Sequence, residues 1–227
     1  MKRAVLALLL AGLCSLGAIV QANEWVIKPI EEVKQAAAQG DAEAQYALGL
    51  MYGLLYVGTD EYHNQDEVWF RKAAEQGHPE AQYELGSMYE GGRAGVTQDY
   101  RMAVEWFRKS AEQGLAKAQN SLAAMYYRGT GITQDYRLAV AWFRKAAEKG
   151  NSMAQWNLGR MYNNGAGVTQ NFEMAYVWFS VSAANGDVLG TLAAEDRDST
   201  AKKLTPAALV DAQTLAAQFF KKYQPKE

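Results

Sequence analysis

The chain has few of the residues on which catalytic and metal centres depend. It contains one cysteine and two histidines among 227 residues. The cysteine, Cys14, lies in an apolar leader, so a chain without that leader has no disulfide, no thiol nucleophile and no cysteine-ligated metal. His63 and His78 stand without a second ligand at metal-binding spacing and without a nucleophile to activate. We therefore expect no catalytic residue, no cofactor and no metal site.

An excess of basic residues is also absent. The 23 lysines and arginines are balanced by 25 aspartates and glutamates, which gives a formal net charge of −2. A strong positive charge is what draws a protein to nucleic acid or to an anionic membrane surface. We therefore expect neither of these as a partner.

The first 22 residues follow the pattern of a secretory signal peptide. A basic start precedes an apolar run over residues 4–20, and Val20-Gln21-Ala22 is a small-residue cleavage pattern. We expect cleavage after Ala22, a periplasmic or secreted mature protein, and contact with a membrane only during export. An uncleaved anchor is an alternative, although glycine and serine dilute the apolar run. A lipoprotein reading at Cys14 is a further alternative, but Leu13 is larger than the small residue expected there.

A unit of 36 or 37 residues repeats along the rest of the chain. Three dipeptides mark it: Ala-Gln at Ala44, Ala81, Ala118 and Ala154; Met-Tyr at Met51, Met88, Met125 and Met161; and Trp-Phe at Trp69, Trp106, Trp142 and Trp178. Each unit shows two apolar stripes at helical spacing with glycines between them, which predicts a helix–turn–helix. One unit cannot bury its apolar face alone, so the units must stack into an all-α solenoid.

Residues 78–114 contain one complete unit. Pro79 suits the first position of a helix that runs to about Glu90, because the missing N–H of proline is not needed there. Asp99 is a good N-cap for a second helix, which ends at Gly114.

These residues resemble the Sel-one-like repeat family, a relative of the tetratricopeptide repeat. The shared pattern is A-x-A-Q-x-x-L-G-x-M-Y, then G-x-G-V-x-Q-D, then A-x-x-W-F-R-K-A-A-E-Q-G, and it recurs in four copies from Asp41 to about Gly186. The resemblance implies an α/α solenoid with a right-handed superhelical path, whose members mostly serve as adaptors for other proteins. The first copy lacks G-x-G-V and has Asp66 where the others have alanine, so we expect an irregular first repeat.

This organisation predicts four repeats with a helical cap at each end. The expected segments are a signal peptide (1–22), an N-terminal capping helix (23–40), an irregular first repeat (41–77), three further repeats (78–114, 115–150 and 151–187), and C-terminal capping helices with a tail (188–227).

The copies differ from one another on one sector of the first helix of each unit. At 100° per residue, the repeated positions share one side of that helix and the varied positions the other. In solenoids of this family the first helices line the concave side, so we expect the varied sector to bind a protein or peptide partner. Its candidate residues are Tyr46, Glu80, Tyr83, Glu84, Lys117, Asn120, Trp156 and Arg160, with Tyr127 at the edge; Asn157 also falls in the sector.

Other interpretations of these residues remain open. The aromatic side chains of the sector are either binding anchors or additional core. They also suit a module that binds cell-wall glycan or peptide. Some disulfide-rich relatives have been linked to β-lactam hydrolysis, but this chain has no S-x-x-K motif. Of the three functional hypotheses, which are binding of a protein or peptide, binding of a cell-wall ligand and hydrolysis, the last is therefore the least favoured.

The second helix of the last repeat differs from the others. The Arg-Lys pair that follows Trp-Phe in three copies becomes Ser180-Val181 in the fourth. We expect a helix that begins at Pro206, capped by Thr205, to cover this neutral face. A shorter helical segment near residues 189–195, a polar turn around Asp196, Asp198 and Ser199, and a frayed tail from Lys221 are expected with it.

Overall fold

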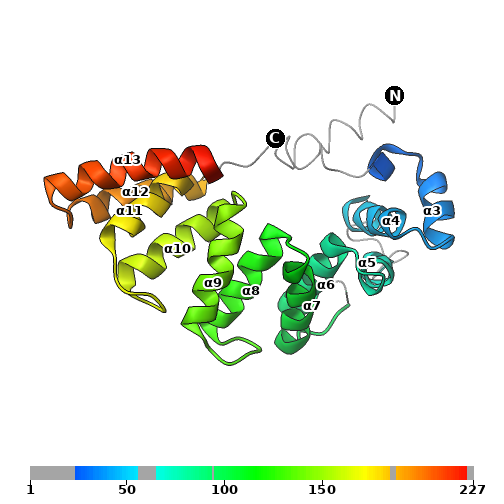
Figure 1. Cartoon of the computed structure of the whole chain (residues 1–227). Coiled ribbons are helices and arrows are strands. Elements are labelled where there is room, and N and C mark those ends of the chain that lie inside the picture. The colour runs from blue at the N-terminus through cyan, green and yellow to red at the C-terminus, as the bar shows by residue number, and fades with distance from the viewer. Residues whose placement is uncertain (1–23, 56–64, 94, 185–187, 224–227) are drawn as a thin grey trace. The chain divides into compact units, whose positions relative to one another are not determined.

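The computed structural model describes residues 24–55, 65–93, 95–184 and 188–223 (Figure 1). Within these ranges the chain forms helices and no strand, which confirms the all-α fold. The leader, its expected cleavage site, the cleavage pattern and His63 lie outside the described residues. No helix within the described ranges combines the length and the apolar character that crossing a membrane requires.

The chain divides between Asp99 and Tyr100 into two compact units, here called unit 1 and unit 2. The helices of unit 1 are η1 (Glu24–Ile27), α3 (Ile30–Ala38), α4 (Ala42–Leu55), α5 (Gln65–Glu75) and α6 (Pro79–Gly91). Those of unit 2 are α7 (Tyr100–Glu112), α8 (Ala116–Arg128), α9 (Tyr136–Glu148), α10 (Ser152–Asn164), α11 (Phe172–Ala183), α12 (Val188–Ala201) and α13 (Pro206–Tyr223). From α3 to α6, and again from α7 to α12, each helix packs against the next one in the chain, as in an α/α solenoid.

The repeated positions of the first helices form the core. In α6 the buried residues are Ala81, Gln82, Leu85, Gly86 and Met88, and the equivalent positions are buried in α8 and α10. At Gly159 the lack of a Cβ is required by close packing, because a Cβ added there would lie 2.6 Å from the ring of Phe179, whereas α8 has Ala123 at this position. The packed sector predicted for the first helices is therefore confirmed at these five positions.

The repeated glutamine has a structural role that its position in the core does not reveal. Its side-chain amide donates a hydrogen bond to a carbonyl at the end of the preceding helix, where carbonyls lack partners within the helix. The four bonds join Gln45 to Ala37, Gln82 to Ala74, Gln119 to Ala111 and Gln155 to Ala147, each at 3.1 Å. Each first helix is thus tied to the end of the helix before it.

The G-x-G-V-x-Q-D loop ends the first helix in a repeated way. Its first glycine adopts a left-handed conformation, as at Gly129 with φ 70°, which suits glycine because it has no Cβ. The glutamine of the loop then donates to a carbonyl in the last turn of that helix, as from Gln134 to Tyr127 at 2.9 Å. Gln98 and Gln170 make the equivalent bonds.

The second helices show why the last repeat has no Arg-Lys pair after its Trp-Phe dipeptide. In three of them a lysine ammonium lies 4.0 Å from the centre of the tryptophan ring: Lys72 over Trp69, Lys109 over Trp106 and Lys145 over Trp142. In α11 the lysine position is the buried Val181, and α13 supplies the contacts to Trp178 instead. Tyr223 stacks on Trp178 at 5.7 Å and Phe219 meets its edge at 5.3 Å. The expected covering helix, with Thr205 as its cap, is confirmed.

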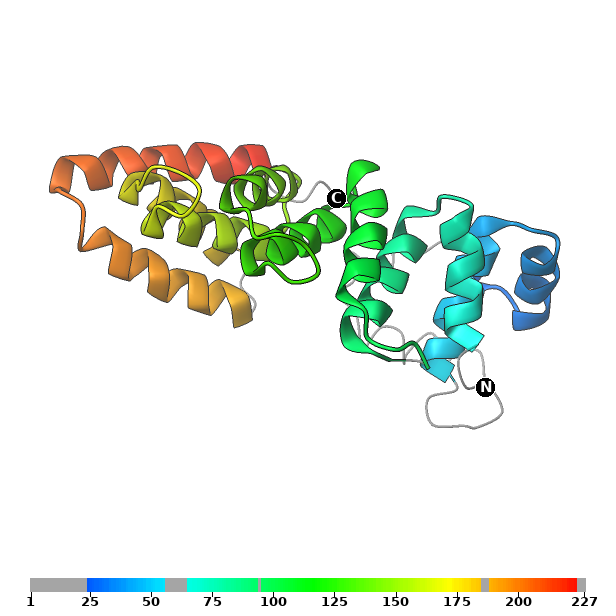
Figure 2. The ribbon, with the colours of Figure 1, turned by 90° about the horizontal axis from the view of Figure 1, so that it is seen from below.

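The C-terminal region also corrects the sequence-based expectations. The segment expected near residues 189–195 is the longer helix α12, and Asp196, Asp198 and Ser199 lie within it rather than in a turn. The helix continues because it packs along α11, as α13 also does, while α12 and α13 diverge from each other (Figure 2). Helix α13 extends past Lys221 to Tyr223, whose ring is held on Trp178.

The N-terminal region forms the helix α3 within the segment expected to cap the first repeat. Helix α3 packs against α4, and Val33 and Ala37 join Ala44, Ala47 and Leu48 in one buried cluster. The irregular first repeat still forms its second helix, α5, although Asp66 replaces the alanine of the other copies.

Candidate functional site

The varied sector of the first helices, here called the first-helix face, is accessible to solvent in both units. Tyr46, Glu80, Tyr83 and Glu84 are half-buried in unit 1, and Lys117, Asn120, Tyr127 and Trp156 are half-buried in unit 2. Arg160 is exposed. The four aromatic residues are therefore neither free in solvent nor fully part of the core, and each keeps surface available for a ligand.

The first-helix face of unit 1 gathers negative charge around a buried histidine. His78 is 7% exposed, and its Nε2 lies 3.3 Å from Oε2 of Glu43 while its Nδ1 lies 3.6 Å from Oε2 of Glu80. The ring of Tyr46 lies 4.6 Å from that of His78. Burial raises the pKa of the Tyr46 phenol well above its usual value, and the negative charges of Glu84, Glu80 and Glu43 raise it further. This surface therefore disfavours additional negative charge.

His78 also begins the helix that presents two of these carboxylates. Its Nδ1 accepts a hydrogen bond from the backbone N–H of Ala81 at 3.3 Å, which makes it the N-cap of α6. Asn151 caps α10 in the same way, with a side chain that more commonly does so. Asp41 stands at the same repeat position, and its Oδ1 accepts a hydrogen bond from the backbone N–H of Ala44 at 2.8 Å.

The first-helix face of unit 2 has a different chemistry. The indole Nε1 of Trp156 donates to Oδ2 of Asp196 in α12 at 2.7 Å, and the guanidinium of Arg160 lies 4.8 Å from the centre of the same ring. One edge of Trp156 is therefore occupied by the C-terminal cap. Sequence reasoning missed Asp196, because it placed that residue in a turn instead of on a helix facing α10.

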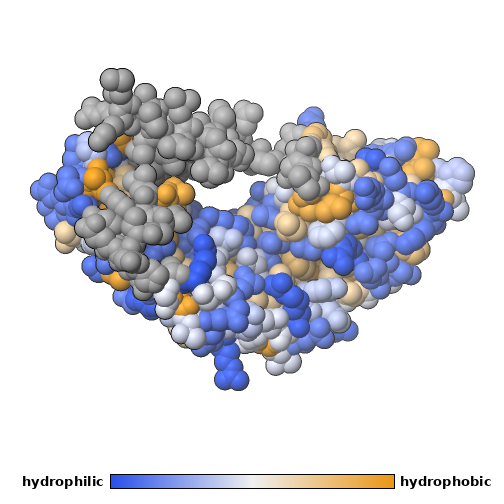
Figure 3. Space-filling view, turned by 180° about the vertical axis from the view of Figure 1, so that it is seen from behind, coloured by the Kyte–Doolittle hydropathy of each residue, from blue (hydrophilic) through white to orange (hydrophobic). Residues whose placement is uncertain are grey.

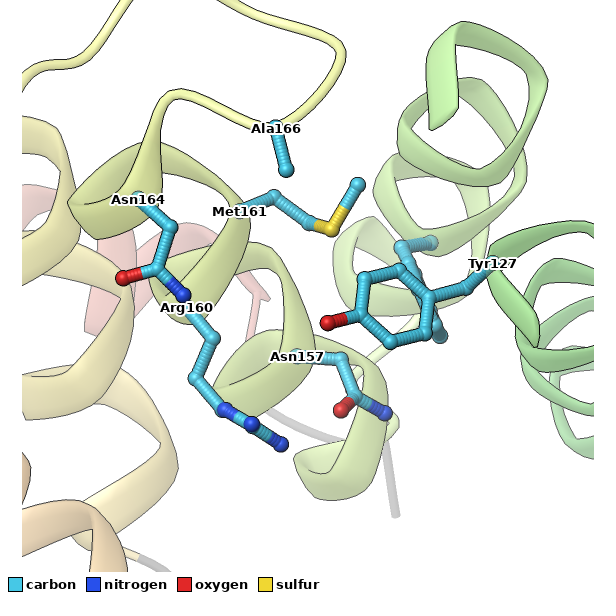
Figure 4. A pocket seen from close by; sticks show the side chains of 7 residues that line it. Tyr127, Asn157, Arg160, Met161, Asn164 and Ala166 are labelled. Carbon is cyan, nitrogen blue, oxygen red and sulfur yellow. The ribbon is translucent and has the colours of Figure 1, made fainter. Parts of the chain in front are cut away.

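A small hollow lies beside Arg160, between α8, α9 and α10. It has a volume of about 20 Å³ and is lined by Tyr127, Phe143, Asn157, Arg160, Met161, Asn164 and Ala166. Figure 4 shows the Tyr127 hydroxyl pointing into the space that Arg160 and Asn157 border. The side-chain amide of Asn157 donates to Oδ1 of Asn120 at 3.4 Å, which links the face of α10 to that of α8. The structure thus brings together four of the unit 2 candidates. Tyr127 and Arg160 line the hollow, Asn120 is hydrogen-bonded to the lining residue Asn157, and Trp156 packs against Arg160.

Over the ranges that the structure describes, no three histidine, cysteine, aspartate or glutamate side chains are placed to hold a metal ion. The side of the molecule seen in Figure 3 is mainly hydrophilic where it is coloured, with separate small apolar areas. A large apolar patch, which often marks a binding surface, is not visible on that side.

The repeats identified above match a known family over most of their length. Residues 42–63, 68–78, 79–115, 116–151 and 152–187 match the Sel1 repeat. The chain belongs to the Sel1 repeat family. Sel1 repeat proteins are typically scaffolds for protein–protein interaction and are generally not catalytic. The breaks around residues 64–67 fall in the first copy, where the sequence departs from the pattern.

Two solved structures of this family resemble the chain. A protective antigen of uropathogenic Escherichia coli strains that displays an SLR fold is 32% identical, with a TM-score of 0.59 over 86% of this chain and 49% of the antigen. A Sel1 repeat protein from Oxalobacter formigenes is 28% identical, with a TM-score of 0.66 over 83% of this chain and 78% of that one. This chain therefore spans about half the length of the antigen. No curated protein matched it.

Proposed function

We propose that this Sel1 repeat protein is a non-catalytic scaffold that binds a protein or peptide partner along the first-helix faces. One observation supports this above the others. The Ala, Gln, Leu and Met positions that the first helices share are buried, whereas the nine positions predicted to bind a partner all remain accessible. Residues that the fold does not require, and that differ from copy to copy, are free to match a particular partner. The first helices would present them on the concave side of the solenoid.

In-cell photo-crosslinking tests this function in each unit separately. A photoreactive residue replaces Tyr83 in unit 1 or Asn120 in unit 2, and captured proteins are identified by mass spectrometry. The matched controls are the exposed Lys72 in α5 and Lys109 in α7, which lie on second helices of the same units. We expect a discrete partner from at least one first-helix position and from neither control. Capture from the controls alone would mean that the partner binds the second helices.

A cell-wall glycan ligand is the second candidate, because glycans bind on the faces of aromatic rings. Tyr46 and Trp156 already use ring surface within the protein, the first against His78 and the second beneath Arg160. These contacts favour the protein partner. Competition between soluble peptidoglycan fragments and the crosslinked partner would support the glycan instead.

We also propose that the chain is exported through a cleaved leader and acts in the periplasm or outside the cell. The basic start, the apolar run and the pattern that ends at Ala22 support this. N-terminal sequencing of the protein from the periplasmic fraction should find Asn23 as the first residue. An intact Met1 in the membrane fraction would identify an uncleaved anchor.

A further inference from the structure

The hollow in unit 2 has a cation, Arg160, in its lining. Arg160 is exposed and forms no ion pair with any residue that the structure describes; its one recorded interaction is with the ring of Trp156. The carboxylate of Asp196 accepts a hydrogen bond from the indole N–H at the edge of that ring at 2.7 Å. Trp156 therefore positions the guanidinium at the hollow without satisfying its five N–H donors.

Two further donors border the same space. The side-chain oxygen of Asn164 accepts a hydrogen bond from Asn163 at 2.9 Å, which leaves the Asn164 amide nitrogen on the side of Arg160 (Figure 4). The ring of Tyr127 packs against Tyr136 at 5.4 Å, and among the described residues its hydroxyl has no hydrogen-bond partner. Together with the guanidinium, these groups offer donors from two helices to one small space.

One acceptor completes the set. Asn157 uses its amide nitrogen to bond Asn120, so its side-chain oxygen remains to accept a hydrogen bond from a ligand. The lining of the hollow includes no carboxylate. The arrangement suits a ligand that has an anionic oxygen group and an N–H close to it, as a carboxylate on a polypeptide does.

The size of the hollow narrows the class of anion. A volume of about 20 Å³ holds about one water-sized group, so a single ligand oxygen can enter while the remainder stays on the first-helix face. Arginine binds a carboxylate through two parallel hydrogen bonds, and one such cation matches one negative charge. A phosphate monoester carries nearly twice that charge and has three acceptor oxygens, which one arginine in a small hollow does not balance.

We propose that this hollow binds a carboxylate of the partner polypeptide. Arg160 is the charged contact, Tyr127 and Asn164 are additional donors, and Asn157 accepts an N–H next to that carboxylate. The proposal rests on the proposed function, because it names the group that the partner presents to unit 2. The carboxylate belongs either to the C-terminus of the partner or to an aspartate or glutamate side chain.

Nuclear magnetic resonance titration of the full-length protein tests the proposal with small probes. N-acetylglycine presents a C-terminal carboxylate beside an N–H, and N-acetylaspartic acid N-methylamide presents only a side-chain carboxylate. N-acetylglycinamide is the neutral control. We expect saturable shifts of the Arg160 Nε–H signal and of the Asn157 and Asn164 side-chain amides with at least one carboxylate probe, and none with the control. The stronger probe identifies the source of the carboxylate.

Variants assign the interaction to the hollow. Because hydrogen bonds to charged groups are among the stronger ones, Arg160→Gln should weaken probe binding by about tenfold, and Tyr127→Phe by a smaller factor. Arg137→Gln makes the same change of charge at an exposed position of α9 and should leave binding unchanged. Circular dichroism checks that each variant is folded. Equal binding by Arg160→Gln and the unchanged protein, or equal shifts with N-acetylglycinamide, would overturn the proposal.

The two proposals fail in different ways. A protein that captures a partner from Asn120 but shows no shift with either carboxylate probe contradicts the carboxylate site alone. A protein that binds N-acetylglycine at Arg160 but captures no partner from either unit contradicts the scaffold function. In that case the hollow is a site for a small free carboxylate.

Discussion

Unit 1 and unit 2 build their first-helix faces on the same framework and give them opposite chemistry. In unit 1, Glu43, Glu80 and Glu84 surround Tyr46, while in unit 2 the corresponding surface presents Arg160 with neutral amides and a phenol. The glutamine bonds to the preceding helix measure 3.1 Å in both units. Because the repeat constrains only the packed side of each first helix, charge on the other side can change without cost to the fold.

This contrast has a consequence for the partner. A polypeptide that contacts both faces has to offer basic or neutral groups to unit 1 and an anionic group to unit 2. Electrostatic complementarity of this kind contributes more to specificity and to the rate of association than to affinity.

The largest difference is expected between two tryptophans at one repeat position. Trp106 in unit 2 is 7% exposed, whereas its counterpart Trp69 in unit 1 is half-buried. Trp106→Ala should lower the free energy of unfolding by about 3–5 kcal/mol, because it leaves a cavity in the core. Trp69→Ala should lower the free energy of unfolding by a clearly smaller amount. Equal losses in urea denaturation would show that the two positions are packed alike.

Replacement of the repeated glutamine should lower stability by the same amount in both units. Gln82→Leu and Gln119→Leu each remove the donor to a carbonyl at the end of the preceding helix. We expect a loss of about 1–3 kcal/mol from each, because the buried carbonyl of Ala74 or Ala111 loses its partner. Denaturation of the two variants measures this. A loss in only one unit would contradict a shared framework.

A smaller and again similar effect is expected from the lysines above the tryptophans. Lys72→Ala in unit 1 and Lys109→Ala in unit 2 each remove an ammonium group 4.0 Å from a ring centre. Exposed cation–π pairs contribute about 0.5–1 kcal/mol, so each variant should lose no more than that in thermal or urea unfolding. A loss several times larger would assign these lysines a role in packing.

The last predicted effect is a loss of stability at alkaline pH, which Tyr46 of unit 1 causes and which is absent at neutral pH. The pKa of Tyr46 is raised in the folded protein above the value near 10 of an unfolded tyrosine. The unfolded chain therefore loses this proton first, so stability is fully present below about pH 10 and falls as the pH rises further. Tyr46→Phe should reduce that fall, and Glu84→Gln should bring ionisation of Tyr46 closer to its usual range. Tyrosinate absorbance and alkaline unfolding measure both; an unchanged alkaline transition in Tyr46→Phe would show that another group controls it.

Much of the architecture could be predicted because the chain contains four copies of the repeat that can be compared with one another. Four aligned copies distinguish packed from varied positions within a single chain, and the change from Arg-Lys to Ser180-Val181 indicated a covering helix. The errors came where no copy exists for comparison. Helix α12 has no counterpart in the repeats, so its length, and the bond from Asp196 to Trp156, had no signal in the pattern.

The site was predictable only as a list of residues. Helical periodicity placed Tyr127 and Arg160 on the varied sector. Asn164 follows Arg160 by four residues and lies on the same side of α10, but it was not among the predicted residues. The hollow itself depends on how α10 packs beside α8 and α9. Likewise, the contact of Tyr46 with His78, the N-cap of α6, depends on how α4 packs against α5.

By itself, the sequence determined the repeat, the two helices within each repeat and the side of each helix that is buried, because periodicity and glycine placement act over a few residues. Only the tertiary structure decided which polar groups meet. The bond from Trp156 to Asp196 and the carboxylates of Glu80 and Glu84 near Tyr46 depend on side chains from different helices, and their distances are set by packing between helices that are not consecutive in the chain.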